Sequence, residues 1–126
     1  MNLKLLTGSL AVCQLPADAP LPAWAANATG FLSITRTAGE LSIVCLEMHV
    51  PGTVKQVPGW RAFQVEGPLD FGLTGVLASI ATPLAEAGIS IFAVATYDTD
   101  YVLVKTDRVG AATKALRAAG HTVREG

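Results

Sequence analysis

An internal repeat places the strongest limit on what this chain can fold into. Residues 33–45 (SITRTAGELSIVC) align with residues 93–105 (AVATYDTDYVLVK) at an offset of 60 without a gap. In each copy an acidic residue, Glu40 or Asp100, directly precedes an apolar run. β-Branched and apolar residues on both sides of a short polar turn are typical of a β-hairpin. The repeat therefore predicts two tandem units of about 60 residues each.

The second unit begins with a strand and a helix. Residues 60–66 (WRAFQVE) predict a strand that Gly67-Pro68 ends. Between residues 73 and 84, apolar side chains recur at the spacing of one helix face. Asp70 is a candidate cap for this helix and Gly88 the expected stop. Pro83 lacks a backbone donor, so it should kink or loosen the last turn.

The rest of the second unit completes a familiar order of elements. Residues 89–96 and 101–105 predict the two strands of the hairpin. An apolar stripe over residues 109–119 predicts a second helix that Gly120 ends, and residues 121–124 predict a last strand. One amphipathic stripe per helix puts both helices on one face of an antiparallel sheet. The prediction is an α+β fold of the ferredoxin-like βαββαβ type.

The first unit is predicted to be an abbreviated copy of the second. Where the offset places its first helix, three prolines in QLPADAPLPAWAANATG allow at most a short turn around residues 24–27. The second helix position, VPGTVKQVPG, is bracketed by prolines. The units are predicted to be residues 1–59 and 60–126. Because the first could hardly bury its sheet alone, we expect one continuous core.

Composition and charge exclude several classes of protein. The net charge is −1 and the nine basic residues are scattered, which argues against a nucleic-acid partner. No apolar run approaches the roughly 20 residues of a membrane-spanning helix, and the N-terminus is better explained as a first strand than as a signal peptide. We expect a soluble, cytoplasmic protein.

Neither a metal site nor a cofactor site is predicted. The two cysteines, Cys13 and Cys45, stand apart, and His49 and His121 do not complete a zinc spacing. The simplest explanation is that both cysteines are small buried side chains in a reducing compartment. The sequence also lacks a nucleophile elbow, a P-loop and a dinucleotide fingerprint.

Two stretches carry the polar groups that could form a site. Asp98 and Asp100 are either an acid/base pair of a small enzyme or, more simply, turn chemistry. The glycine-rich loop 67–75 precedes a helix, so its backbone N–H groups could hold a carboxylate. Alternatively, Asp70 only caps the helix and the glycines allow close packing. With residues 87–90 expected across the same edge, these groups would complement the two charges of an α-amino acid.

The sequence resembles the ACT domains, which are small βαββαβ regulatory modules that bind amino acids. The shared residues are 59–104 (GWRAFQVEGPLDFGLTGVLASIATPLAEAGISIFAVATYDTDYVLV), with ELSIVC, residues 40–45, in the first unit. The most similar branch is the tandem-ACT group that includes the CASTOR-type cytosolic arginine sensors and small stand-alone bacterial proteins. The resemblance implies a non-enzymatic, amino-acid-binding regulatory protein.

The resemblance also implies a place for the ligand. In the family, the ligand lies between the strand-to-helix loop of one unit and the edge of a neighbouring unit, often across a dimer. A chain with a single ACT pair would need to form a homodimer to build such a site. An unidentified protein partner would then respond to whether the ligand is bound. The implied alternative is a structural or protein-interaction module whose ligand site has decayed. The matching ligand-binding positions are Asp70, Phe71, Gly72, Leu73, Thr74, Gly88, Ile89, Ser90, Thr96 and Asp100.

Overall fold

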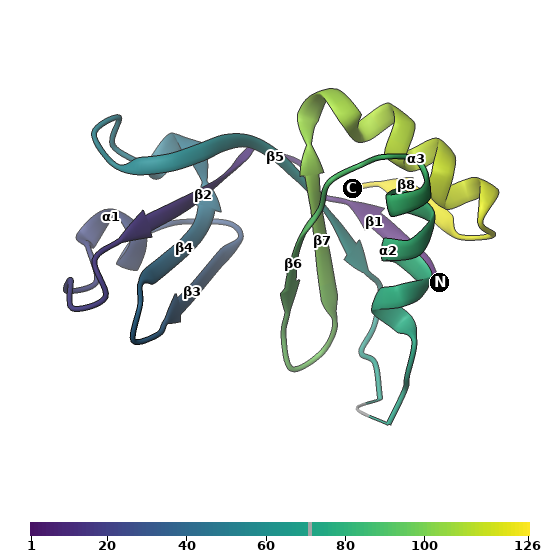
Figure 1. Cartoon of the computed structure of the whole chain (residues 1–126), viewed down its shortest axis with the longest axis horizontal. Coiled ribbons are helices and arrows are strands. Elements are labelled where there is room, and N and C mark those ends of the chain that lie inside the picture. Colours follow the sequence, from purple (N-terminus) through teal and green to yellow (C-terminus); the bar gives the residue numbers. More distant parts are fainter. Residues whose placement is uncertain (71) are drawn as a thin grey trace. The chain divides into compact units, whose positions relative to one another are not determined.

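The computed structural model describes residues 1–70 and 72–126, which form two compact units (Figure 1). The N-terminal unit comprises residues 8–60, and the C-terminal unit comprises residues 1–7 together with residues 61–126. Strand β5, Lys55–Val65, supplies its first half to the N-terminal unit and its second half to the C-terminal unit. Both units combine strands and helices, so the predicted α+β class is confirmed.

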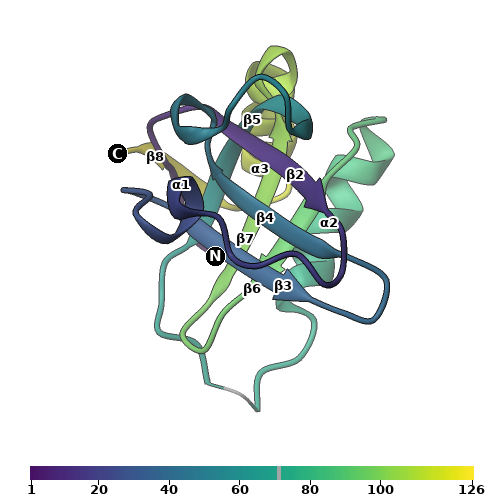
Figure 2. The same ribbon diagram turned by 90° about the vertical axis from the view of Figure 1, so that its left-hand side faces the viewer.

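The N-terminal unit is a ferredoxin-like fold with shortened helices. Its sheet has the order β3-β4-β2-β5 and is antiparallel throughout, and Figure 2 shows β2, β4 and β3 side by side. Helix α1 has only four residues, and a 3₁₀ helix, η1, replaces the second helix. The predicted effect of the prolines is thus confirmed. The elements are β2 (Leu10–Leu15), α1 (Ala23–Ala26), β3 (Leu32–Arg36), β4 (Leu41–Leu46) and η1 (Glu47–His49).

The C-terminal unit has the complete βαββαβ order plus one added strand. After β5 come α2 (Val76–Glu86), β6 (Phe92–Ala95), β7 (Asp100–Lys105), the 3₁₀ helix η2 (Thr106–Arg108), α3 (Val109–Ala118) and β8 (Thr122–Glu125). Strand β1, Asn2–Leu5, lies between β5 and β8. It is antiparallel to β5 and parallel to β8. The sheet order is therefore β6-β7-β5-β1-β8.

The place of β1 changes the predicted unit boundary. A division at residues 59 and 60 puts the first seven residues into the N-terminal unit, whereas their contacts lie with the C-terminal unit. Leu3 pairs with Val65 of β5 and with Val123 of β8. Its buried side chain thereby joins the core beneath the helices. The apolar run at the N-terminus predicts a strand, but local pattern cannot tell which sheet it joins.

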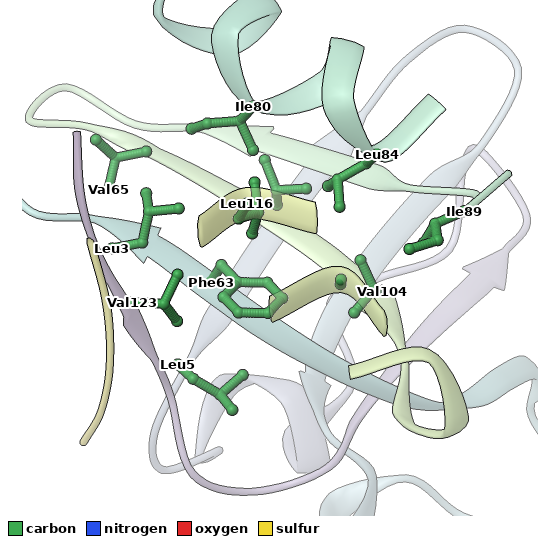
Figure 3. Packing of buried hydrophobic residues seen from close by; sticks show 12 residues of the cluster. Leu3, Leu5, Phe63, Val65, Ile80, Leu84, Ile89, Val104, Leu116 and Val123 are labelled. Atoms are coloured by element: carbon green, nitrogen blue, oxygen red, sulfur yellow. The ribbon is translucent and has the colours of Figure 1, made fainter. Parts of the chain in front are cut away.

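The buried apolar residues form two clusters, so the expected single continuous core is wrong. In the C-terminal unit, side chains from α2 and α3 meet the sheet, with Phe63 near the centre (Figure 3). The N-terminal unit has its own smaller cluster around Ile43 and Ala25 of α1. Even a four-residue helix closes part of a sheet face, so the abbreviated unit keeps a local core.

Both long helices end at glycine, as predicted. Gly88 has φ 72° and Gly120 has φ 96°, in the left-handed region that a glycine adopts without a Cβ clash. The N–H of Gly88 bonds to the carbonyl of Ala85 at 3.0 Å, and that of Ile89 to Leu84 at 2.9 Å. This pair of bonds is a Schellman motif. Gly120 ends α3 with the same two bonds.

The start of α2 differs from the prediction that Asp70 caps it. The N-cap is Gly75, with φ 75°, and no side chain bonds to the helix end. Asp70 instead folds back on its own loop, where its Oδ1 accepts the N–H of Gly72 at 2.8 Å. Short-range bonds of this kind compete with capping for Asp side chains. The first N–H groups of α2 therefore have no side-chain cap.

The repeat is real, but its structural offset is 59 and not 60. Arg36 pairs with Leu41 across the first hairpin, and Ala95 pairs with Asp100 across the second. The burial of β4 and β7 also agrees in this alignment. Asp100 therefore corresponds to Leu41 and not to Glu40. A shift of one residue exchanges the two faces of a strand, so the alignment of acidic residues in the sequence is misleading.

Pro83 creates a gap in the hydrogen bonding of α2 that His121 fills. A helical N–H at position 83 would bond to the carbonyl of Ser79, but proline has none. The Nε2 of His121 lies 2.8 Å from that carbonyl oxygen. Because a carbonyl oxygen only accepts, Nε2 carries the proton and donates it. The buried imidazole thus takes the place of the missing backbone donor.

A double-mutant cycle tests this substitution of donors. His121→Leu removes the donor to Ser79 and should destabilise the fold by about 1–3 kcal/mol. Pro83→Ala supplies a backbone N–H to the same carbonyl, so His121→Leu should cost clearly less in that background. Urea unfolding of the four proteins gives the coupling free energy. Strictly additive free energies would contradict the claim that the His121 imidazole takes the place of the missing backbone donor.

Candidate functional site

The loop that leads into α2 is tied to the turn between β6 and β7. The N–H of Leu69 donates to the carbonyl of Asp98 at 2.7 Å, and the Thr99 hydroxyl donates to the carbonyl of Val65 at 2.5 Å. In Figure 1 the loop and the turn lie at the same end of the C-terminal unit. We call this arrangement of residues 65–70 and 96–99 the loop–turn junction.

The turn itself is held by its two threonines. The Thr96 hydroxyl donates to the carbonyl of Thr99 at 3.0 Å and also accepts the Thr99 N–H at 3.3 Å. Thr99 is buried, with 6% of its surface exposed, although it lies in a turn. Because Thr99 is buried and its polar groups are hydrogen-bonded, the turn is held in one conformation.

The backbone also approaches closely at Gly67. A Cβ placed on this residue would lie 2.9 Å from the Leu69 nitrogen and 3.2 Å from the Asp98 carbonyl oxygen. Both atoms are backbone and cannot swing away as a side-chain end would. The junction therefore requires glycine at this position for space.

Two cavities flank the turn, one on each face of the sheet. Because Val102 and Val104 pack in the core beneath the helices, Asp100 lies on the helix face and Tyr101 on the opposite face. The helix-side cavity, about 240 Å³, is lined by Leu69, Asp70, Leu73, Val76 and residues 95–100. The strand-side cavity, about 350 Å³, is lined by Gln64, Gly67, Pro68, Tyr101 and residues 96–99.

The helix-side cavity brings together four of the predicted ligand-binding residues, namely Asp70, Leu73, Thr96 and Asp100. Gly72 and Thr74 lie exposed in the adjoining loop. The prediction for Phe71 falls on a residue outside those that the structure describes. The geometry of the cavity thus agrees with the loop-and-hairpin part of the prediction, while the binding roles of these residues stay predictions.

Gly88, Ile89 and Ser90 are placed differently from what the sequence suggested. They follow the C-terminal end of α2, whereas the loop precedes its N-terminal end. Eleven helical residues separate the two ends by about 16 Å. Ile89 is a buried core residue, and these three residues line neither cavity. The expectation that they face the loop across one edge is therefore wrong for a single chain.

The helix-side cavity has a polarised lining. Asp70, Asp98 and Asp100 are among its lining residues, and none of the described lining residues is basic. The uncapped N-terminus of α2 adjoins it and contributes backbone donors with a partial positive charge. Among residues 1–70 and 72–126, no cluster of His, Cys, Asp and Glu could hold a metal ion. The arrangement suits a ligand with both an ammonium and a carboxylate group.

Sequence reasoning missed several residues of the junction. Thr99 looks like an ordinary turn residue, and its burial depends on Val65, which is 34 positions away. Gln64 and Tyr101 look like alternating outward positions of two strands, yet the Gln64 Nε2 donates to the Tyr101 hydroxyl at 3.3 Å. The Gly67-Pro68 pair is the one sequence feature that indicates the junction, because such pairs are typical of tight turns.

The cysteines take no part in either cavity. Cys13 and Cys45 are free thiols buried in the core of the N-terminal unit. Burial raises the pKa of the Cys13 thiol to about 11, and the neighbouring Cys45 adds to the shift. Burial also raises the pKa of Cys45. Both thiols are therefore protonated at neutral pH, which fits the predicted structural role.

A glycine substitution tests the close approach in the junction. Gly67→Ala should destabilise the protein by about 1–3 kcal/mol, because the added methyl group overlaps backbone atoms. Gly52→Ala is the matched control, since its Cβ would meet no atom within 4 Å. Thermal unfolding of both variants gives the comparison. Equal melting temperatures for the two variants would contradict the packing described here.

Known proteins resemble this chain in both fold and sequence. A solved structure from Agobacterium tumefaciens matches with a TM-score of 0.93 and 42% identity, over 99% of this chain and 92% of that one. The aspartokinase alpha and beta subunits match with a TM-score of 0.65 over 94% of this chain and 97% of that chain. Their 16% identity shows a shared fold alone.

A curated relative matches part of the chain. The human "Cytosolic arginine sensor for mTORC1 subunit 1" is 39% identical over 59 residues, which are 46% of this chain and 18% of that protein. The chain thus spans less than a fifth of that relative's length. No helix in the described part of the chain is long and apolar enough to cross a membrane.

Family models account for both units. One model, for an N-terminal domain, matches residues 8–53, which fall within the N-terminal unit. The model of the ACT domain matches residues 55–118, just over half of the chain. These residues include β5, both long helices and the loop–turn junction. The chain therefore belongs to the ACT domain family.

Proposed function

We propose that this chain is a non-enzymatic regulatory protein that binds an amino acid in the helix-side cavity. The cavity itself is the observation that carries the proposal. One wall has the Asp100 carboxylate, and the N-terminus of α2 adjoins the cavity without a side-chain cap. At about 240 Å³, the space suits a small metabolite better than the larger ligands of pockets of about 300–1,000 Å³.

The ligand's two charges fit the two kinds of group in the cavity. Asp100 accepts charge-assisted hydrogen bonds from the ammonium group. The N–H groups at the start of α2 and in the preceding loop hold the carboxylate, with help from the helix dipole. Leu73 and Val76 supply apolar contact for the ligand's carbon atoms. Each group thereby has a role that its chemistry supports.

The curated relative supports the same class of ligand. Its printed name describes a cytosolic arginine sensor. The matched segment covers 46% of this chain and a small part of the relative, so the relative supports an amino acid as the ligand class and the cytoplasm as the location.

We further propose that the protein acts as a homodimer that buries apolar side chains beside the cavity. Leu73 and Leu77 are 53% and 41% exposed near the start of α2, and a second copy would cover them. A ligand that favours one arrangement of the copies shifts the population by its differential affinity and so signals to a protein partner. Light scattering that gives a monomer mass at micromolar concentration would contradict the dimer.

The competing function is a structural or protein-interaction module whose ligand site has decayed. A thermal-shift panel of the twenty amino acids separates the two functions. A ligand at 100 times its dissociation constant should stabilise the protein by about 2.7 kcal/mol, which a melting curve resolves. If no member of the panel shifts the melting temperature, the interaction module is the better account.

Substitution of Asp100 tests the proposed binding mode. Asp100→Asn keeps the shape but loses the charge, and should weaken binding of the selected amino acid by about 1.5–3 kcal/mol, measured by calorimetry. Asp98→Asn should cost less than about 1 kcal/mol. Asp107→Asn in η2 is the matched control, since it makes the same charge change outside both cavities.

Melting curves without ligand complete the test of Asp100. If Asp100 served only the hairpin, Asp100→Asn would lower the melting temperature while leaving the affinity near normal. Equal affinity of Asp100→Asn and the unmodified protein would rule out the proposed mode.

A further inference from the structure

The strand-side cavity shares residues 96–99 with the helix-side cavity, but Leu73, Val76 and Asp100 line the helix-side cavity alone. The strand-side cavity lies on the face of the sheet that points away from α2 and α3, because Gln64 and Tyr101 alternate with the core residues Phe63, Val65 and Val102. Its volume of about 350 Å³ exceeds the 240 Å³ of the helix-side cavity. Residues 96–99, the hydrogen-bonded turn described above, form part of its lining.

The lining of this cavity has a distinct chemistry. Its lining residues include Gln64 and Tyr101, together with Asp98 and the largely exposed Tyr97, which it shares with the helix-side cavity. None of the described lining residues carries a positive charge. The Gln64–Tyr101 hydrogen bond, 3.3 Å long, braces the two strands behind the cavity. The cavity thus offers a negative charge, acceptor oxygens and the negative faces of aromatic rings.

We infer that the strand-side cavity binds an organic cation, meaning an ammonium or guanidinium group on a short apolar chain. The carboxylate of Asp98 accepts charge-assisted hydrogen bonds from the head group. The tyrosine rings attract the cation through their quadrupoles and pack against its chain. The proposal gives a binding role to Asp98, to which the proposed amino-acid site assigns none.

Other ligand classes fit the lining less well. An anion would meet the Asp98 carboxylate without a basic side chain to offset it. A bare metal ion needs several anionic or imidazole ligands, and the described lining supplies one carboxylate. A wholly apolar ligand would strip water from the carboxylate and the amide without replacing its hydrogen bonds.

Titration with small probes tests the inference on the full chain. n-Butylguanidinium chloride is added to ¹⁵N-labelled protein, and n-butanol and sodium butyrate serve as neutral and anionic probes of similar length. The cation should shift the amide signals of Gln64, Gly67 and Tyr101, and the other two probes should leave them in place. Shifts of equal size and affinity with n-butanol would overturn the inference, because an apolar hollow would explain them.

Three variants locate the cation. Asp98→Asn should weaken n-butylguanidinium binding about tenfold or more, because it removes the charged acceptor. Tyr101→Leu should weaken it about two- to fivefold through loss of the ring. Asp107→Asn, the matched charge control, should bind like the unmodified protein. Melting curves verify that each variant is folded.

The outcomes also separate this inference from the proposed function. If Asp100→Asn, and not Asp98→Asn, abolishes binding of the cation, then the probe occupies the helix-side cavity and the inference is wrong. If Asp98→Asn leaves the affinity unchanged, the carboxylate is not the anchor and the inference is equally wrong. Neither result bears on whether an amino acid binds beside Asp100, which calorimetry with that ligand decides.

Discussion

Strand β5 is the element on which the strand pairing of both units depends. Its first half is the closing strand of the N-terminal unit beside β2, and its second half is the central strand of the C-terminal unit between β7 and β1. Eleven residues of continuous strand therefore carry the backbone pairing of both units. The residues that follow β5 form the loop into α2, so the same strand fixes where that loop begins.

The loop–turn junction links β5 to the candidate site. The Thr99 hydroxyl bonds to Val65, the last residue of β5, and the Leu69 N–H bonds to Asp98. Gly67 leaves just enough room for the two backbones to meet. These contacts fix the position of the turn between β6 and β7 relative to β5, with one cavity on each face of the sheet. Its position follows from core strand pairing, which gives a binding site the rigid support it needs.

Much of this fold could be predicted from the sequence, because it depends on local patterns. The apolar stripes of the two long helices depend on residues close together in the sequence. The same is true of the helix ends at Gly88 and Gly120 and of the prolines that shorten the helices of the first unit. The prediction was wrong where a partner lies far along the chain. The offset of the repeat depends on cross-strand register, and the place of β1 depends on Val65 and Val123. For the site, the sequence predicted that the loop before α2 and the hairpin turn lie together. The burial of Thr99 could not be predicted, because no local pattern indicates it.

The most direct test of the account is a map of ligand contacts in solution. ¹⁵N-labelled protein is titrated with the amino acid that gives the largest thermal shift, and the perturbed backbone signals are assigned. We predict that the largest changes fall in residues 69–76 and 95–100, with little change in the strand-side residues Gln64 and Tyr101. Changes centred on residues 88–90, or confined to the N-terminal unit, would contradict the claim that the helix-side cavity is the binding site.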